Sequence, residues 1–122
     1  MATTFAAQTN YHSGLVAEDS VADHYVRIGA DIAARRWRGR AGEVDLIAQQ
    51  GDDLVFVEVK KSRSHSHAAR RISQRQMERI YAAAGEYLAA SGRDQNTNVR
   101  FDVALLDQHG AIDIIENAFG SF

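Results

Sequence analysis

Two short β-rich runs separated by a turn constrain the fold of this chain more than any other feature. Residues 44–48 and 54–59 are apolar except for one acid in each run, and Gln50-Gly51-Asp52-Asp53 lies between them. Such runs favour strands, and glycine beside aspartate favours a tight reversal of the chain. We therefore expect an antiparallel β-hairpin.

The turn also determines which residues of the hairpin face each other. A turn of two residues and a turn of four residues give the same register, in which Asp45 faces Glu58. Glu43 faces Lys60 in the same way. Because side chains alternate along a strand, these four residues share one face with Ile47 and Phe56. The opposite face is expected to be core throughout and consists of Val44, Leu46, Ala48, Val55, Val57 and Val59.

The two facing acids, Asp45 and Glu58, require positive charge nearby. Directly opposed side chains in a sheet have Cβ atoms about 5 Å apart, and like charges there repel each other. Two carboxylates, together with the backbone carbonyl of Val59, suit Mg²⁺ or Mn²⁺ that retains several waters. Such an ion assists the hydrolysis of phosphodiesters near neutral pH. Lys60, on the same face, is placed to orient a water or to stabilise the charge that develops on the phosphate.

A purely structural interpretation of the same residues stays open. Glu43 and Lys60 can form one cross-strand ion pair, while Asp45 and Glu58 are solvated at the open end of the sheet. The charge pattern alone does not separate this interpretation from a metal site.

The rest of the chain predicts two helices and three further strands. Residues 1–12 have no hydrophobic period and are expected to form a flexible arm before a single domain at 13–122. We expect a helix from Ser13 to Gly29, with Leu15, Ala22, Tyr25 and Ile28 along one stripe. Glu18 lies on that stripe, where a carboxylate needs a partner.

The second helix is expected from Ser73, its N-cap, to Gly92, and Gln76 is assigned to a capping box with Ser73. The strands are expected at 30–37, 99–106 and 112–115, and residues 62–72 as a basic loop. The order α-β-β-β-α-β-β indicates an α/β fold with a central sheet flanked by both helices.

Charge is distributed unevenly along the chain. The net charge is −2, but eleven of the fourteen basic residues lie between Arg35 and Arg79, which gives that segment +5 and the remainder −7. A basic centre of this kind can attract phosphate, although an ordinary solvated surface explains the charges equally well. The chain has no cysteine and no long apolar run, so we expect a cytoplasmic protein without disulfides or a membrane span.

The segments Gly42 to Ala48, Leu54 to Lys60 and Arg100-Phe101-Asp102-Val103 resemble the YraN-like family of small bacterial proteins. That family is similar in pattern to PD-(D/E)XK nucleases and Holliday-junction resolvases, which share an αβββαβ restriction-endonuclease-like core with a mixed sheet. Valine stands at position 44 in place of the motif's proline. Gln76 stands where a basic residue is more usual.

The resemblance implies roles for particular residues. Asp45, Glu58, Lys60 and the helix-one residue Glu18 would be catalytic, although Glu18 can equally cap a helix or pair with an arginine. Asp45, Glu58, the Val59 carbonyl and Glu43 would hold Mg²⁺ or Mn²⁺. The residues expected to contact nucleic acid are Arg36, Arg38, Arg40, Lys61, Arg63, Arg71, Arg75 and Arg79.

The resemblance thus implies a Mg²⁺-dependent endonuclease that acts on structured or repair-intermediate nucleic acid, with DNA favoured as the partner. The alternative is a catalytically silent module of the same fold that binds nucleic acid or a DNA-processing protein. The sequence leaves the oligomeric state open. A homodimer is one candidate, because resolvase-like enzymes cut two strands.

Overall fold

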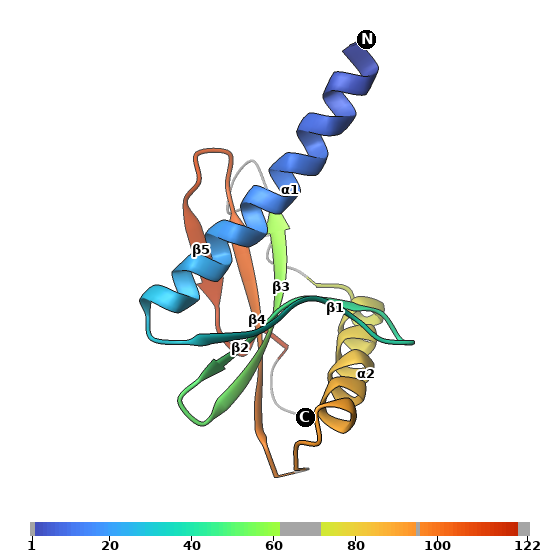
Figure 1. Ribbon diagram of the computed structural model, residues 1–122, viewed down its shortest axis with the longest axis vertical. Helices are drawn as coiled ribbons and strands as arrows, with labels where there is room; N and C mark the ends of the chain where they lie inside the picture. Colours follow the sequence, from blue (N-terminus) through green and yellow to red (C-terminus); the bar gives the residue numbers. More distant parts are fainter. Residues whose placement is uncertain (1, 62–71, 95, 120–122) are drawn as a thin grey trace.

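The elements follow each other in the order that the sequence predicts (Figure 1). The computed structural model describes residues 2–61, 72–94 and 96–119, with residues 2–14 described by their backbone alone. The elements are α1 (Ala2–Arg27), β1 (Asp31–Arg38), β2 (Glu43–Gln50), β3 (Asp53–Lys61), α2 (Gln74–Ala90), β4 (Asn98–Leu106) and β5 (Ile112–Ile115).

The strands form one sheet in the order β1-β2-β3-β4-β5, and the fold is a mixed α/β fold with two helices. Strands β3 and β4 are parallel, with α2 in the connection between them, and the other neighbouring pairs are antiparallel. Parallel neighbours need such a crossover, whereas antiparallel ones can be joined by short turns. The expected mixed sheet is therefore confirmed.

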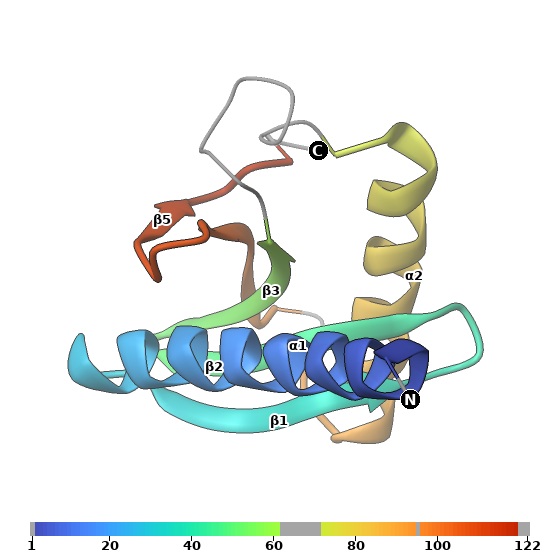
Figure 2. The same ribbon diagram turned by 90° about the horizontal axis from the view of Figure 1, so that it is seen from above.

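The two helices cover different faces of the sheet, and α1 runs across β1, β2 and β3 (Figure 2). The α1 side of the core consists of Val21, Ala22, Tyr25, Ala30, Leu46, Ala48, Val55, Val57 and Ala104. The α2 side consists of Val44, Ile47, Leu54, Phe56, Ile80, Ala83, Ala84, Tyr87 and Phe101. The hairpin is consequently buried on both faces along most of its length.

The hairpin has the predicted register near its turn. Pairing extends from Gln50 opposite Asp53 to Leu46 opposite Val57. The expected pairs of Asp45 with Glu58 and of Glu43 with Lys60 lie beyond the last of these pairs. Beyond that point the Asp45 carboxylate accepts a hydrogen bond from the backbone N–H of Val59. A side chain of β2 thus occupies a backbone donor of β3 where the ladder stops.

Val44 was expected on the face of Leu46 and Ala48, but it packs on the α2 side of the core. Its partner on β1 is Trp37, which also packs on that side. Arg36 lies between Trp37 and Arg35, which pairs with Leu46, and its backbone is left-handed, with φ at 49°. The alternation of faces therefore changes at this point of the β1–β2 ladder, which a simple count along the strand does not predict.

Helix α1 is longer than expected, because it begins at Ala2 and includes residues assigned to a flexible arm. Alanines at positions 2, 6 and 7 favour a helix through their intrinsic propensity. The prediction missed this because it relied on a hydrophobic period, which these residues do not show. The first turns project beyond the sheet (Figure 1). Gly29 closes the helix with φ at 97°, and Ile28, expected on the buried stripe, is 47% exposed after the last helical residue. In the described part of the chain, no helix combines the length and hydrophobicity needed to cross a membrane.

A buried charged cluster connects α1 to β4. Asp102 is completely buried and accepts hydrogen bonds from the Tyr25 hydroxyl at 2.7 Å and from Arg100 at 2.9 and 3.1 Å. The backbone N–H of Asn117 donates a fourth at 3.1 Å. Burial and the neighbouring Asp102 raise the pKa of the Tyr25 hydroxyl, which therefore stays a donor. Because a buried carboxylate is costly unless fully paired, these donors hold the C-terminal segment against α1 and β4.

Removing the charge of Asp102 should destabilise the fold strongly. We expect Asp102→Asn to lower the free energy of unfolding by about 3 kcal/mol, because it removes the buried partner of Arg100 and leaves the longer ion pair with Asp53 at 3.7 Å. Tyr25→Phe should cost about 1 kcal/mol, the value of one hydrogen bond. Urea unfolding followed by circular dichroism measures both, and Asp23→Asn on the exposed side of α1 is the control. Equal stability of Asp102→Asn and wild type would contradict the structural role of this cluster.

Candidate functional site

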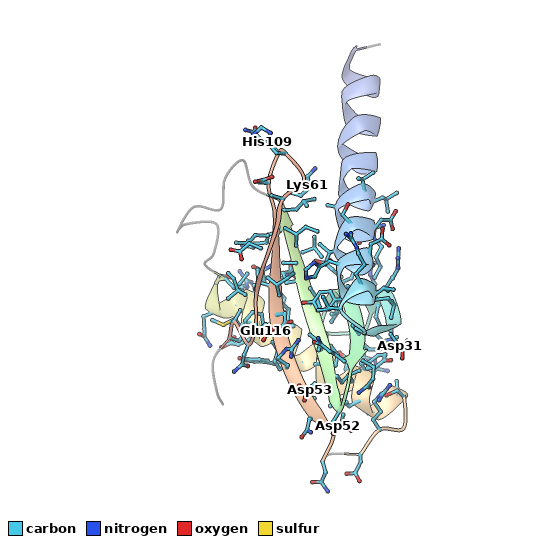
Figure 3. All side chains as sticks on the ribbon, turned by 90° about the vertical axis from the view of Figure 1, so that its left-hand side faces the viewer. Asp31, Asp52, Asp53, Lys61, His109 and Glu116 are labelled. Atoms are coloured by element: carbon cyan, nitrogen blue, oxygen red, sulfur yellow. The ribbon has the colours of Figure 1, made fainter. Side chains whose placement is uncertain are left out.

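The end of the hairpin remote from its turn faces a cavity of about 240 Å³ beside the start of α2. Figure 3 shows Lys61 at this end of the sheet, and Asp52 and Asp53 at the other end. The cavity is lined by Gly42, Glu43, Asp45, Glu58, Gln76, Arg79 and Ile80. Three of the four predicted acids therefore line one cavity, together with a cation and an amide.

Asp45 lies where both sides of the sheet can reach it. It lines this cavity and also a smaller one of about 120 Å³ on the α1 side, which Glu18, Val59 and Lys61 share with it. Burial raises the pKa of Asp45 to about 6, against the lowering effect of the hydrogen bond from Val59. The charges of Glu18 and Glu43 contribute to this rise, and the charge of Arg36 opposes it. Asp45 is thus the carboxylate that the other acids surround.

Glu58 has the higher pKa of the two facing acids. Burial and then the charge of Asp45 raise it to about 7. The charge of Lys60, a hydrogen bond from Gln76 and the charge of Arg79 act in the opposite direction. The repulsion expected between Asp45 and Glu58 is therefore present, although the strands do not pair these residues directly.

Glu18 of α1 pairs with an arginine, one of the two roles that the sequence left open. Its carboxylate accepts from the Nε of Arg36 at 2.9 and 3.0 Å, and its side chain is only 16% exposed. Arg36 makes this pair from the left-handed backbone conformation described above, which costs a non-glycine residue about 1–2 kcal/mol. The pair places the charges of both residues within reach of Asp45.

Glu43 also forms an ion pair, but with Arg38 at 3.0 Å. The sequence assigned it either to the metal or to Lys60. Within the described residues, no group of three acidic or histidine side chains is arranged to hold a metal. Glu43 is therefore held by a cation from β1. Lys60 is half-buried, and its charge acts on Glu58.

The loop between β1 and β2 is fixed to the second half of α2. The Glu86 carboxylate accepts hydrogen bonds from the backbone N–H groups of Arg40 and Ala41, each at 2.7 Å. These bonds lower the pKa of Glu86. A Cβ at Gly39 would lie 2.7 Å from Glu86 Oε2 and 2.9 Å from the Trp37 ring, so a side chain at this position would displace one or both of them. The loop continues into Gly42 and Glu43, which form one wall of the larger cavity.

The residues expected to contact nucleic acid fall into three groups. Arg36 and Arg38 are ion-paired with acids near the cavity. Arg40 and Lys61, with Arg75 and Arg79 on the first turns of α2, are exposed. Arg63 and Arg71, together with most of the expected basic loop, lie outside the described residues.

Gln76 has a role that the sequence did not predict. The N-cap at Ser73 is confirmed, because the Gln76 N–H donates to Ser73 Oγ at 3.1 Å. The Gln76 side chain does not complete a capping box. Its amide donates to Glu58 Oε1 at 2.9 Å instead. The contact joins residues eighteen positions apart, so no local pattern predicts it. The sequence signals it only through the presence of Gln76 where a basic residue is more usual.

Asp45 and Glu58 have the chemistry of a small divalent-metal site. Their oxygens are the hard donors that Mg²⁺ and Mn²⁺ prefer, and the cavity has room for the waters that Mg²⁺ retains. The raised pKa of each carboxylate indicates that the described side chains do not fully compensate the two charges. A divalent cation would supply that compensation, so the donor set fits such an ion.

The raised pKa of Glu58 predicts a pH dependence of stability in metal-free protein. Below the ordinary pKa of 4.5 the residue is protonated in both states and costs nothing. Between pH 4.5 and about 7 the unfolded chain releases the proton while the folded protein keeps it, so the free energy of unfolding falls, and above pH 7 the loss is complete.

We expect Glu58→Gln to be more stable than wild type by about 2 kcal/mol at pH 8 in EDTA, and by much less at pH 4.5. Chemical unfolding at both pH values measures the difference. Glu78→Gln on the exposed face of α2 is the control and should show no such dependence. If the gain of Glu58→Gln were the same at both pH values, the burial of an ionised Glu58 would be disproved.

Comparison with known proteins identifies close relatives over nearly the whole chain. The family described as "Uncharacterised protein family UPF0102" matches residues 17–106. A UPF0102 protein of Cereibacter sphaeroides (strain KD131) is 55% identical over 116 residues, which cover 95% of this chain and 99% of the relative.

Two further relatives come from other genera. A UPF0102 protein of Ruegeria pomeroyi is 53% identical over 91% of the chain and 90% of its own length. One of Dinoroseobacter shibae is 43% identical over 86% of the chain and 78% of its own length. The names of these proteins state no activity. The matched residues include β1, β2, β3 and α2, and therefore the cavity described above.

Proposed function

This chain belongs to protein family UPF0102, the YraN-like family that its sequence resembles, and from its cavity we propose that it is a Mg²⁺- or Mn²⁺-dependent endonuclease of nucleic acid. The observation that carries the proposal is the juxtaposition of Asp45 and Glu58, two half-buried carboxylates with raised pKa values in one cavity. Enzymes place perturbed carboxylates of this kind at sites that bind metal or transfer protons.

The proposed core is the αβββαβ arrangement of PD-(D/E)XK nucleases, formed by α1, β1, β2, β3, α2 and β4. The order of the elements and the mixed sheet support it. The pairing of β2 with β3 ends at Leu46 and Val57, and the proposed acids line the cavity beyond this end.

Asp45, Glu58 and the Val59 carbonyl would hold the ion, with Glu43 next to them. When bound, the ion would supply Lewis acidity toward the scissile phosphate. Lys60 would stabilise the negative charge that develops on the phosphate, since its charge already acts on Glu58. Glu18 would orient a water from the α1 side, where it and Asp45 line the smaller cavity.

The substrate would be held by phosphate contacts from basic residues around the cavity. Arg79 lines the cavity, and Arg75 is one turn earlier on the same helix. Arg40 lies in the loop that continues into Gly42 of the cavity wall, and Glu86 holds the backbone of this loop. Structured or repair-intermediate DNA is the proposed substrate, and a homodimer would allow both strands of a junction to be cut.

Removing the central carboxylate should abolish cleavage without loss of the fold. Asp45→Asn keeps an oxygen that accepts from the Val59 N–H but removes the charge, so we expect at least a 100-fold loss of cleavage of a branched DNA substrate in Mn²⁺. Lys60→Ala should lower the rate by about 100-fold, the usual effect of losing one electrostatic stabiliser. Gel assays on branched, single-stranded and RNA substrates in Mg²⁺ and Mn²⁺ measure these rates.

Asp31→Asn at the start of β1 is the matched control and should cleave like wild type. If wild type binds these substrates but forms no product in either ion, the nuclease proposal fails. The pairing of Glu43 with Arg38 would then favour the alternative, a silent nucleic-acid-binding module, because it leaves two carboxylates in place of three.

A further inference from the structure

The first turn of α2 brings an amide to Glu58. Gln76 donates from Nε2 to Glu58 Oε1 at 2.9 Å, and both side chains line the larger cavity. The Gln76 backbone is fixed by the N-cap, because its N–H donates to Ser73 Oγ. Both ends of this contact are therefore anchored, one in a capped helix and one in a central strand.

The two facing carboxylates are each held by one oxygen. Asp45 accepts from the Val59 N–H through Oδ2, and Glu58 accepts from Gln76 through Oε1. A carboxylate that is fixed through one oxygen presents the other oxygen in a defined direction. Partners that orient metal-binding groups in this way commonly change metal affinity by about 10–100-fold when they are removed.

We propose that Gln76 is a positioning residue that fixes Glu58 through Oε1, so that Glu58 binds a divalent ion through Oε2 alone. This inference rests on the proposed function. Together with Asp45 held through Oδ2, it gives a site in which each carboxylate contributes one oxygen. Two such ligands leave most of an octahedral shell to waters and phosphate oxygens, which suits Mg²⁺ and Mn²⁺ better than Ca²⁺.

The neutrality of Gln76 is part of the proposal. A cation at this position would also hold Glu58, but it would cancel one of the two charges that attract the ion. An amide supplies the donor without adding charge to the cavity. The positive charges that the structure places near Glu58 belong instead to Lys60 and Arg79.

The test is the affinity for Mn²⁺ alone, measured by isothermal titration calorimetry on the full chain without nucleic acid. Gln76→Met keeps the length of the side chain and removes the donor, and we expect its Mn²⁺ dissociation constant to rise about tenfold. The matched control is Gln74→Met. Gln74 lies on the same turn, is exposed and contacts Glu78, so its removal should change the constant less than twofold.

Thermal unfolding in EDTA distinguishes a loss of Mn²⁺ affinity from a loss of stability of the fold. Gln76→Met should unfold within a few degrees of wild type, and Gln76→Ala, a shorter variant with high helix propensity, should show the same weakened Mn²⁺ binding. The cleavage rate of Gln76→Met should recover as Mn²⁺ is raised, whereas that of Asp45→Asn should not.

The two proposals fail in different ways. If wild type binds Mn²⁺, Asp45→Asn does not, and both Gln76 variants bind like wild type, the positioning role is wrong and the metal site stands. If wild type binds no Mn²⁺ at millimolar concentration, the proposed function and this inference are both wrong. An equal loss of Mn²⁺ affinity in Gln74→Met and Gln76→Met would also overturn the role. Such a loss would arise from a change in the first turn of α2 and not from the missing hydrogen bond to Glu58.

Discussion

The arrangement around the cavity depends on one electrostatic conflict, the placement of two carboxylates beside each other at the end of a buried hairpin. Asp45 and Glu58 follow apolar residues that pack on both sides of the sheet, so the strands cannot rotate these acids into solvent without exposing the core. Burial raises both pKa values, and neighbouring acids contribute: Glu18 and Glu43 raise the pKa of Asp45, and Asp45 raises that of Glu58. The surrounding elements supply hydrogen-bond donors and cations to Asp45 and Glu58.

The two helices act on Asp45 and Glu58 from opposite sides of the sheet. Glu18 of α1 adds negative charge near Asp45, and Arg36, which pairs with Glu18, adds positive charge there. From α2, Gln76 and Arg79 act on Glu58. Between them, the Val59 N–H binds the Asp45 carboxylate at the point where the ladder ends. A site of this kind belongs to no single element, because the sheet supplies the charges and the helices set their surroundings.

Local patterns in the sequence predict much of this fold. The hairpin register near its turn, the order of elements, the cap at Ser73 and the ends of the last strand depend on neighbours in the chain, and these predictions are confirmed. The family resemblance likewise agrees with the matched family. Helix propensity without a hydrophobic period explains why the start of α1 was misjudged.

The contacts that were missed all join residues of different elements. Val44 changes sides at the left-handed backbone of Arg36, which no count along β2 can foresee. Glu43 pairs with Arg38 of the neighbouring strand, and the Gln76 amide turns to Glu58. Each depends on the direction of a side chain across two elements, whereas sequence spacing specifies directions within one element only.

The contact between Gly39 and Glu86 makes two distant positions interdependent. The absence of a side chain at 39 matters because a long acid from α2 lies against that backbone and the Trp37 ring. If a shorter residue stood at 86, the contact of that acid with position 39 would be lost while the Trp37 ring stayed close, and the loop would lose the acceptor for its two N–H groups. The two positions are therefore expected to covary among relatives.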